Sequence, residues 1–449
     1  MKNYLVSKLP RRFREMHPNH QRIAWGMLLL GMLTITAKAM VALKEMTIAW
    51  RYGVSSEVDA YFLAMTMTTW LPMVLCSTGV VVLVPRLMAM NNPSERSRFI
   101  SELNGRIIIL GMAMVILSVF LGWAHGLTTS GLSTGIQERV RLITWQLSPL
   151  AMLTLFSGIL SIRLQAREQF GYALMEAVPA FCIVAFILFT PDDINLWPLI
   201  SGTLFGAVAQ ALWLGFLTHR ADDGLGRIAI THDSPCWRGF YGGLGLMALG
   251  QLIAALSIPI DQIFAAQMGD GAIAMLGYTN RIIAFAIGIG TLIIGRVLLP
   301  VLSEVAASGE YDLGRTQAMK WSGLMFVIWS GVALVGWLLA PWGVRLLFER
   351  GAFTAENTAA ISLLLRFGLL QLPFYCAGVV LVQWLAALGR YKELLMITIG
   401  VLCAKVGLNV LLVDAYALVG IMLSTSGSAF VLLALSVFYV KANRESAIK

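Results

Sequence analysis

The residues of this sequence that could do chemistry are charged side chains inside long hydrophobic runs. Lys38, Arg281, Lys405 and Asp261 all lie within such runs. A charge at the middle of a membrane-spanning helix costs about 2.5–3.5 kcal/mol on insertion scales, so each one needs a partner or a function. Lys and Arg bind phosphate oxygens through charge-assisted hydrogen bonds. If Lys38 and Arg281 face a shared cavity, they would attract an anion, and phosphate or pyrophosphate is the natural candidate.

The acidic and amide candidates suggest other roles. Asp261 together with Asn409 predicts a site for a coupling ion, and Lys405, four residues before Asn409, has either a structural or a coupling role. Asp59, at the start of the second hydrophobic run, is expected to cap a helix or to pair near Lys44 rather than to bind substrate. For any single charge, a structural ion pair or an extended side chain reaching the membrane surface is the competing interpretation.

Composition indicates that the bilayer is the solvent of this chain. Hydrophobic residues make up 58% of the 449 residues and charged residues only 13%, whereas a soluble domain is about one-quarter charged. The net charge of +9 is explained by basic loops on one side of a membrane, so no nucleic-acid partner is expected. The five cysteines are scattered and form no CxxC or Cys/His cluster, so we expect neither disulfides nor a metal.

About twelve hydrophobic runs are each long enough to span a bilayer, which takes roughly 20 residues. The first six lie at 23–43, 60–85, 104–125, 140–162, 170–190 and 195–218, and the second six at 239–266, 273–300, 319–341, 358–386, 393–413 and 415–440. The sequence therefore predicts an all-α polytopic membrane protein. Its predicted parts are a basic cytoplasmic tail (1–22), an N-terminal six-helix lobe (23–218), a cytoplasmic linker (219–238), a C-terminal six-helix lobe (239–440) and a short cytoplasmic tail (441–449).

The distribution of basic residues predicts the orientation. By our count, segments on the side of the N-terminus hold 22 Lys and Arg residues, and the opposite loops hold 6. Basic residues accumulate in cytoplasmic loops. We therefore expect a multi-pass protein of the bacterial inner membrane with both termini in the cytoplasm.

A weak internal repeat relates the two predicted lobes. Gly53 corresponds to Gly269, Pro85 corresponds to Pro300, and Ser148-Pro149 corresponds to Leu372-Pro373. These pairs occur in one order with a slowly drifting offset. Because both lobes begin on the same side, the repeat is parallel, which is typical of one class of repeat-built transporters.

Three segments resemble the MurJ/MviN lipid flippase family of the MOP superfamily, which also contains the MATE and polysaccharide exporters. They are "ALKEMTIAWRYGVSSEVDAYFLAM" at 42–65, "GYTNRIIAF" with "GTLIIGRVLLPVLSEVAASGEY" within 277–311, and "LLFERGAFTAENT" at 346–358. The resemblance implies a V-shaped pair of six-helix lobes around a central cationic cavity. It also implies a flippase for a polyprenyl-diphosphate-linked saccharide that works by alternating access.

The resemblance assigns site residues one position at a time. Lys38 and Lys44 stand where the family carries arginines in its first helix, and Arg281 matches the arginine of an eighth-helix Asp-Arg-x-x-Glu motif. Asn280 and Ala284 replace the two acids of that motif, and Pro72-Met73 stands in place of a second-helix arginine pair. The substrate-binding set predicted here is therefore Lys38, Lys44, Arg281, Asn280 and Asp59, with Asp261, Asn409 and Lys405 as ion-coupling residues.

The departures from the family motif favour an exopolysaccharide or other cell-surface glycan precursor as the substrate. A lipid II flippase for peptidoglycan and a MATE-type drug/cation antiporter are the alternatives, and a non-transporting scaffold for glycan assembly is a third. Membrane lipids and glycan-assembly proteins are the expected partners. The only small ligand expected besides substrate is a coupling cation, Na⁺ or H⁺. The loops are short and carry no Gly-rich nucleotide loop, so we expect no enzyme and no ATP-driven transport.

Overall fold

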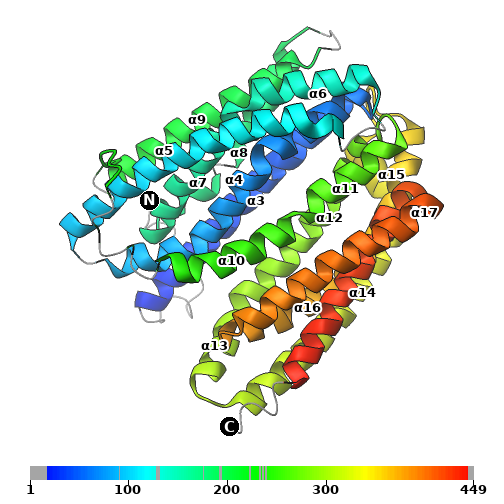
Figure 1. The fold of residues 1–449 in the computed structure, drawn as a ribbon. Helices are drawn as coiled ribbons and strands as arrows, with labels where there is room; N and C mark the ends of the chain where they lie inside the picture. Colours follow the sequence, from blue (N-terminus) through cyan, green and yellow to red (C-terminus); the bar gives the residue numbers. More distant parts are fainter. Residues whose placement is uncertain are drawn as a thin grey trace. The chain divides into compact units, whose positions relative to one another are not determined.

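The structure is a computed structural model that describes residues 18–442, apart from 91, 128–131, 175, 192–194, 222–223, 232–233, 235–236 and 238–239. Most of the predicted basic tail (1–22), Cys236 and the end of the predicted C-terminal tail lie outside the described residues. Throughout the described part the secondary structure is helical, with no strand (Figure 1).

The helices of the first half of the chain follow the predicted hydrophobic runs. They are α3 (Pro18–Tyr52), α4 (Ser56–Ala89), α5 (Pro93–Ala124), η1 (His125–Leu127), α6 (Thr134–Leu147), α7 (Pro149–Ala166), η2 (Phe170–Leu174), α8 (Ala177–Phe189) and α9 (Trp197–Ala221). The run at 140–162 is divided between α6 and α7. The division falls at Ser148, because the ring of the following Pro149 cannot continue a regular helix.

The helices of the second half of the chain also follow the predicted hydrophobic runs. They are α10 (Phe240–Ala255), α11 (Ser257–Ala265), η4 (Ala266–Met268), α12 (Ala272–Ile293), η5 (Ile294–Leu298), α13 (Leu299–Ala307), α14 (Tyr311–Phe348), α15 (Ala355–Leu369), α16 (Gln371–Ala387) and α17 (Tyr391–Ala442). The run at 358–386 is divided between α15 and α16 at Leu370, three residues before Pro373. The predicted correspondence of Ser148-Pro149 with Leu372-Pro373 thus falls at two interrupted helices.

Among the described residues, ten helical segments are long and apolar enough to cross a membrane. The first predicted span lies on α3, and the last two lie on α17, which has a non-helical residue at Ala417 (φ 50°, ψ −133°). All twelve predicted spans therefore fall on helices. The prediction of an all-α polytopic membrane protein is confirmed.

Two compact units make up the structure, and each is described by itself. One unit comprises 1–45, 79–108 and 153–234, and the other comprises 46–78, 109–152 and 235–449. The predicted division into lobes at 23–218 and 239–440 stays a prediction.

In the first unit, small residues bring α8 and α9 into close contact. A Cβ at Gly206 would lie 2.6 Å from the Cα of Pro179, and one at Gly202 would lie 2.9 Å from the Cα of Ile183. Glycines four residues apart on one helix face allow such close approach in membranes. Leu160, Leu164 and Leu214 form a small buried core nearby.

The predicted linker also packs within this unit. Buried Arg163 donates to the carbonyls of Gly224 (2.7 Å) and Leu225 (2.9 Å), and Asn104 donates to Leu225 as well (2.8 Å). The Ala229 amide donates to the carbonyl of Ser101 at 3.0 Å. The described part of the linker is therefore hydrogen-bonded to α5 and α7.

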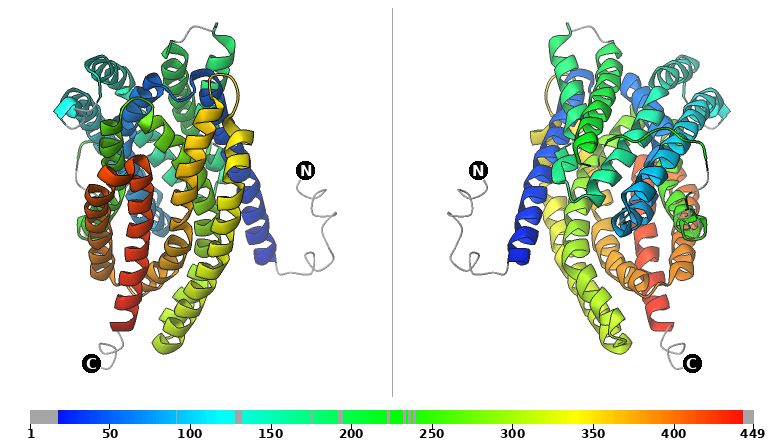
Figure 2. Two further views of the ribbon diagram at one scale, coloured as in Figure 1. Left: turned by 90° about the vertical axis from the view of Figure 1, so that its right-hand side faces the viewer. Right: turned by 90° about the vertical axis from the view of Figure 1, so that its left-hand side faces the viewer.

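In the second unit, α14, α16 and α17 pack side by side (Figure 1). Gly314 of α14 lies directly against the buried ring of Trp384, where a Cβ would come within 2.2 Å of a ring carbon. The chain reverses at Ala417, so that the two halves of α17 lie antiparallel, as the orange and red helices of Figure 2 show. Gly420 permits this tight reversal, because a Cβ there would lie 2.4 Å from the carbonyl oxygen of Leu412.

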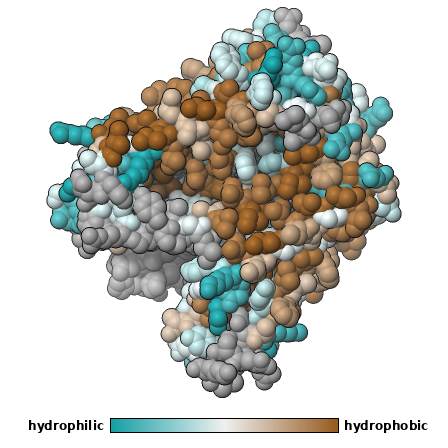
Figure 3. Space-filling view, viewed as in Figure 1, coloured by the Kyte–Doolittle hydropathy of each residue, from teal (hydrophilic) through white to brown (hydrophobic). Residues whose placement is uncertain are grey.

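The exterior of these helices is strongly apolar, as a bilayer solvent requires. Much of the surface in Figure 3 is hydrophobic. On α14, for example, Val327, Leu334, Leu338 and Trp342 are each more than half exposed. Exposed apolar surface of this extent is costly in water and favourable in lipid.

Candidate functional site

A polar cluster is buried where α11 meets the two halves of α17. Lys405 is 1% exposed, and its ammonium lies 2.8 Å from Oδ1 of Asp261. Asn409 is fully buried and donates from Nδ2 to the same Asp261 oxygen at 3.1 Å. The structure therefore brings together all three residues that the sequence predicted as an ion-coupling group.

The second half of α17 completes this cluster with neutral oxygens. The Lys405 ammonium donates to the hydroxyls of Ser424 (3.1 Å) and Thr425, and it lies 3.3 Å from the carbonyl oxygen of Ile421. Ser424 in turn donates to Oδ1 of Asn409. The local sequence explains the arrangement, since Lys405 and Asn409 are four residues apart on one helix face and the reversal at Ala417 places residues 421–425 opposite them.

The lysines of α3 lie in the first unit and are both paired. Lys38 lies 2.6 Å from Oε2 of Glu176, which immediately precedes α8, and the two side chains are 47% and 59% exposed. Lys44 pairs with its neighbour Glu45 at 2.7 Å, and its side chain is only 18% exposed. Lys38 is thus an accessible cation with one acidic partner, whereas Lys44 is largely covered.

Arg281 lies on α12 in the second unit, with its guanidinium 4.0 Å from the ring centroid of Phe62. Gly277, one turn earlier, leaves room for this contact, because a Cβ there would lie 2.8 Å from the Phe62 ring. Asn280 is half-buried beside it in the sequence. A guanidinium can stack on an aromatic face and also donate from its edge to oxyanions.

Asp59 has a structural role in the same unit. Its side chain is fully buried, and its two carboxylate oxygens accept from the amides of Gly271 (2.5 Å) and Ala274 (2.6 Å). These are orphan donors at the first turn of α12. Asp59 therefore caps α12 from α4, and its contacts support the capping interpretation rather than pairing near Lys44.

Two of the segments that carry the family resemblance meet near this cap. The amide of Ala352 donates to the carbonyl of Trp50 at 2.8 Å. Gly53 and Gly351 both have φ of +59°, and a Cβ on either would lie within 2.4 Å of a carbonyl oxygen of the other segment. The third segment contributes Tyr278, whose hydroxyl donates to the carbonyl of Gly53 at 3.1 Å.

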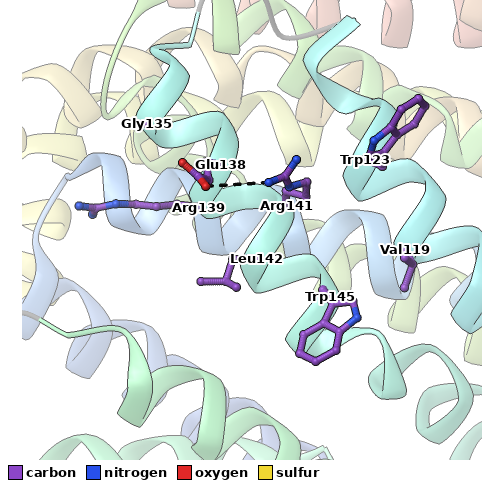
Figure 4. Close-up of a pocket in the computed structure, with 8 residues that line it drawn as sticks. All are labelled: Val119, Trp123, Gly135, Glu138, Arg139, Arg141, Leu142 and Trp145. Atoms are coloured by element: carbon purple, nitrogen blue, oxygen red, sulfur yellow. Dashed lines mark ion pairs between the residues drawn. The ribbon is translucent and has the colours of Figure 1, made fainter.

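An open hollow of about 700 Å³ lies between the end of α5 and α6 (Figure 4). Trp123 of α5 and Trp145 of α6 flank it, and Glu138 pairs with Arg141 at 3.9 Å on its rim. Indole rings of this kind suit the membrane–water interface. None of the site residues predicted from the sequence lines this hollow.

Sequence reasoning missed several partners of the predicted residues. Glu176 lies 138 positions from Lys38, and no periodicity links the two. Ser424 and Thr425 resemble the many hydroxyl residues that bond their own helix backbone, although the run Ser424-Thr425-Ser426 in an apolar span is a signal that could have found them.

Comparison with known families gives one match over most of the chain. The family model described as "Lipid II flippase MurJ" matches residues 48–449. The curated relatives include a probable lipid II flippase MurJ of a Synechocystis species, 25% identical over 444 residues, which covers 93% of this chain and 81% of the relative. Another, from Rickettsia prowazekii, is 24% identical over 283 residues and covers 62% of this chain. That match spans about half (54%) of the relative's length.

Solved structures show the same fold. A lipid II flippase MurJ in an inward closed conformation superposes with a TM-score of 0.78 at 21% identity, covering 92% of this chain and 87% of that one. An inward-facing multidrug MATE transporter of the MOP superfamily gives 0.71 at 15% identity, covering 93% of this chain and 98% of that one. The predicted resemblance to MurJ and to the MOP superfamily is confirmed.

Proposed function

Because the chain belongs to the MurJ lipid II flippase family, we propose that it is a flippase for a lipid-linked cell-wall precursor, with lipid II as substrate. The family match over residues 48–449 is the observation that carries this proposal. The curated relatives are also described as probable lipid II flippases. Lipid II, the alternative in the sequence analysis, is therefore better supported than the exopolysaccharide precursor favoured there.

The charged side chains of the membrane helices give physical support to the proposal of a lipid-linked substrate. A lipid-linked diphosphate presents oxyanions. Lys38 and Lys44 of the first unit and Arg281 of the second are each proposed to bind oxyanions by charge-assisted hydrogen bonds. Lys38 is suited to this role, since its side chain is 47% exposed and its ammonium is paired with the carboxylate of Glu176. A diphosphate can take the place of this carboxylate without leaving the ammonium unpaired.

Alternating access of a repeat-built transporter is the proposed mode of action, so the protein is proposed to be a transporter and not an enzyme. The likeness to MATE transporters shows the fold alone. A carrier of cationic drugs is disfavoured by Lys38 and Arg281, since like charges repel the cargo. Insertion in the inner membrane with both termini in the cytoplasm is proposed from the distribution of basic residues.

Complementation tests the function. Cells depleted of their own lipid II flippase are supplied with this chain, and we expect growth to be restored by the wild type. Lys38→Met and Arg281→Met should reduce rescue, because each removes a charge-assisted hydrogen bond of about 1.5–3 kcal/mol, or roughly a 10- to 100-fold loss of affinity. Lys38→Arg retains the charge and should rescue.

A matched control is Lys392→Gln, which removes a positive charge from an exposed residue at the start of α17. It should rescue like the wild type. Wild-type protein that reaches the membrane at normal level but restores no growth would refute lipid II as substrate. Full rescue by both methionine variants would refute the assigned binding residues while leaving the function in place.

A further inference from the structure

The Lys405 ammonium is enclosed by oxygens in a manner typical of a bound cation. It contacts the carboxylate of Asp261, the carbonyl of Ile421 and the hydroxyls of Ser424 and Thr425. Carboxylate, carbonyl and hydroxyl oxygens are hard ligands that suit hard cations. The Lys405 side chain, which carries the positive charge, is 1% exposed.

We propose that Lys405 is a tethered cation that fills an oxygen-lined cation site at the junction of α11 with α17. The protein then needs no free Na⁺ or K⁺ at this place. The corollary is that the site binds a free monovalent cation once the ammonium is removed.

The charges of the cluster support this assignment. Asp261 is the acidic residue in contact with the ammonium, and the other contacts come from neutral groups. The lysine thus balances the carboxylate, and the cluster as a whole is neutral. A free cation entering beside Lys405 would place two positive charges against one buried carboxylate, which is strongly unfavourable in a medium of low dielectric constant.

The neighbouring hydrogen bonds show that the oxygens are held in place without the ammonium. Thr425 donates to the carbonyl of Ile421 at 2.9 Å, and Ser424 donates to Oδ1 of Asn409. Asn409 holds Oδ1 of Asp261 at 3.1 Å. Removal of the ammonium therefore leaves a pre-arranged set of oxygens with one net negative charge.

Thermal unfolding of the purified full-length protein in detergent tests the proposal, with NaCl, KCl and choline chloride compared at equal ionic strength. The wild type should have the same Tm in all three salts. Lys405→Ala should have a lower Tm in choline chloride, and NaCl or KCl should raise it by at least about 2 °C in a saturable manner, because a ligand that binds only the folded state stabilises it.

Two control variants separate cation binding from general salt effects. Lys405→Met lacks the charge but retains the bulk that blocks the site, so it should not respond to the choice of cation. Lys405→Ala combined with Asp261→Asn lacks the negative charge and should also not respond. If Lys405→Ala cannot be purified folded, Lys405→Ser, which also removes both the charge and the bulk of the side chain, is expected to show the same response.

Two results would overturn the proposal. One is a wild-type Tm that rises specifically with Na⁺ or K⁺ and loses this rise in Asp261→Asn. The other is an unchanged Tm across the three salts for folded Lys405→Ala or Lys405→Ser. Neither result depends on which lipid the protein moves, so the outcome is separate from that of the complementation test.

Discussion

The cap that Asp59 provides for α12 gives the sharpest prediction of stability. The N-cap residue of α12 is Gly271, which has φ of +85° and no side chain to accept from the first-turn amides. A Cβ at this position would lie 2.8 Å from a methyl carbon of Val54, so a larger residue cannot supply the cap itself. The carboxylate of Asp59 therefore does so from α4, with bonds of 2.5 and 2.6 Å to Gly271 and Ala274.

Asp59→Ala should destabilise this junction by about 3 kcal/mol. The change leaves two buried amides without their acceptor, and each unsatisfied buried donor costs about 1–3 kcal/mol. Of the range obtained by adding the costs of the two amides, the lower half applies here. The N-terminus of α12 can shift towards water, and typical caps contribute only about 0.5–2 kcal/mol. Asp59→Asn should cost less, because one amide oxygen still accepts.

Hydrogen exchange of the peptide covering residues 269–278 measures the effect locally, and the detergent Tm measures it globally. A loss of 3 kcal/mol corresponds to roughly 100-fold faster exchange of the amides of Gly271 and Ala274. Asp270→Asn is the matched control, because it removes a neighbouring exposed carboxylate and should leave exchange unchanged. Exchange in Asp59→Ala within a factor of three of the wild type would refute the capping argument.

Two further changes test close packing and the docked linker. Gly351→Ala should lower the Tm strongly, since φ is +59° and the added Cβ would lie 2.3 Å from the carbonyl oxygen of Trp50. The control Gly343→Ala adds its Cβ in open space on α14 and should leave the Tm unchanged. Equal Tm values for the two variants would contradict the argument. Arg163→Met removes the donors to the carbonyls of Gly224 and Leu225, each a charged hydrogen bond of about 1.5–3 kcal/mol. Limited proteolysis should therefore cleave the linker at least about tenfold faster. An unchanged cleavage rate would show that the other contacts are enough to hold the linker in place.

The helices of this protein could be predicted because lipid exposure imposes long apolar runs. The interruptions at Ser148 and Leu370 lie immediately before Pro149 and three residues before Pro373. The paired glycines of the repeat fit as well, because Gly53 and Gly269 both have positive φ, at 59° and 99°. The sequence is informative at such positions, because proline and glycine each meet a backbone requirement that other residue types do not.

The pairing of charges could not be predicted to the same degree. Asp261 and Asn409 were grouped in the sequence because polar residues in apolar spans are few, and the structure places them in contact, while their role in ion coupling stays a prediction. The partner of Lys38, however, depends on how α8 packs against α3, and the acceptors of Asp59 are backbone amides that any sequence would carry. Such contacts follow from tertiary packing and leave no local signal.

Burial and the number of partners together distinguish the roles of the cations in this membrane protein. Lys405 is fully buried and has four oxygen contacts, so a ligand could reach it only by disassembling the junction of α11 with α17. Lys38 is half exposed and is paired with the carboxylate of Glu176, which an anion can replace. The free energy of inserting a charged side chain into the membrane does not by itself distinguish the two lysines. The difference in their surroundings is what makes Lys405 a structural cation and leaves Lys38 as a candidate for the diphosphate.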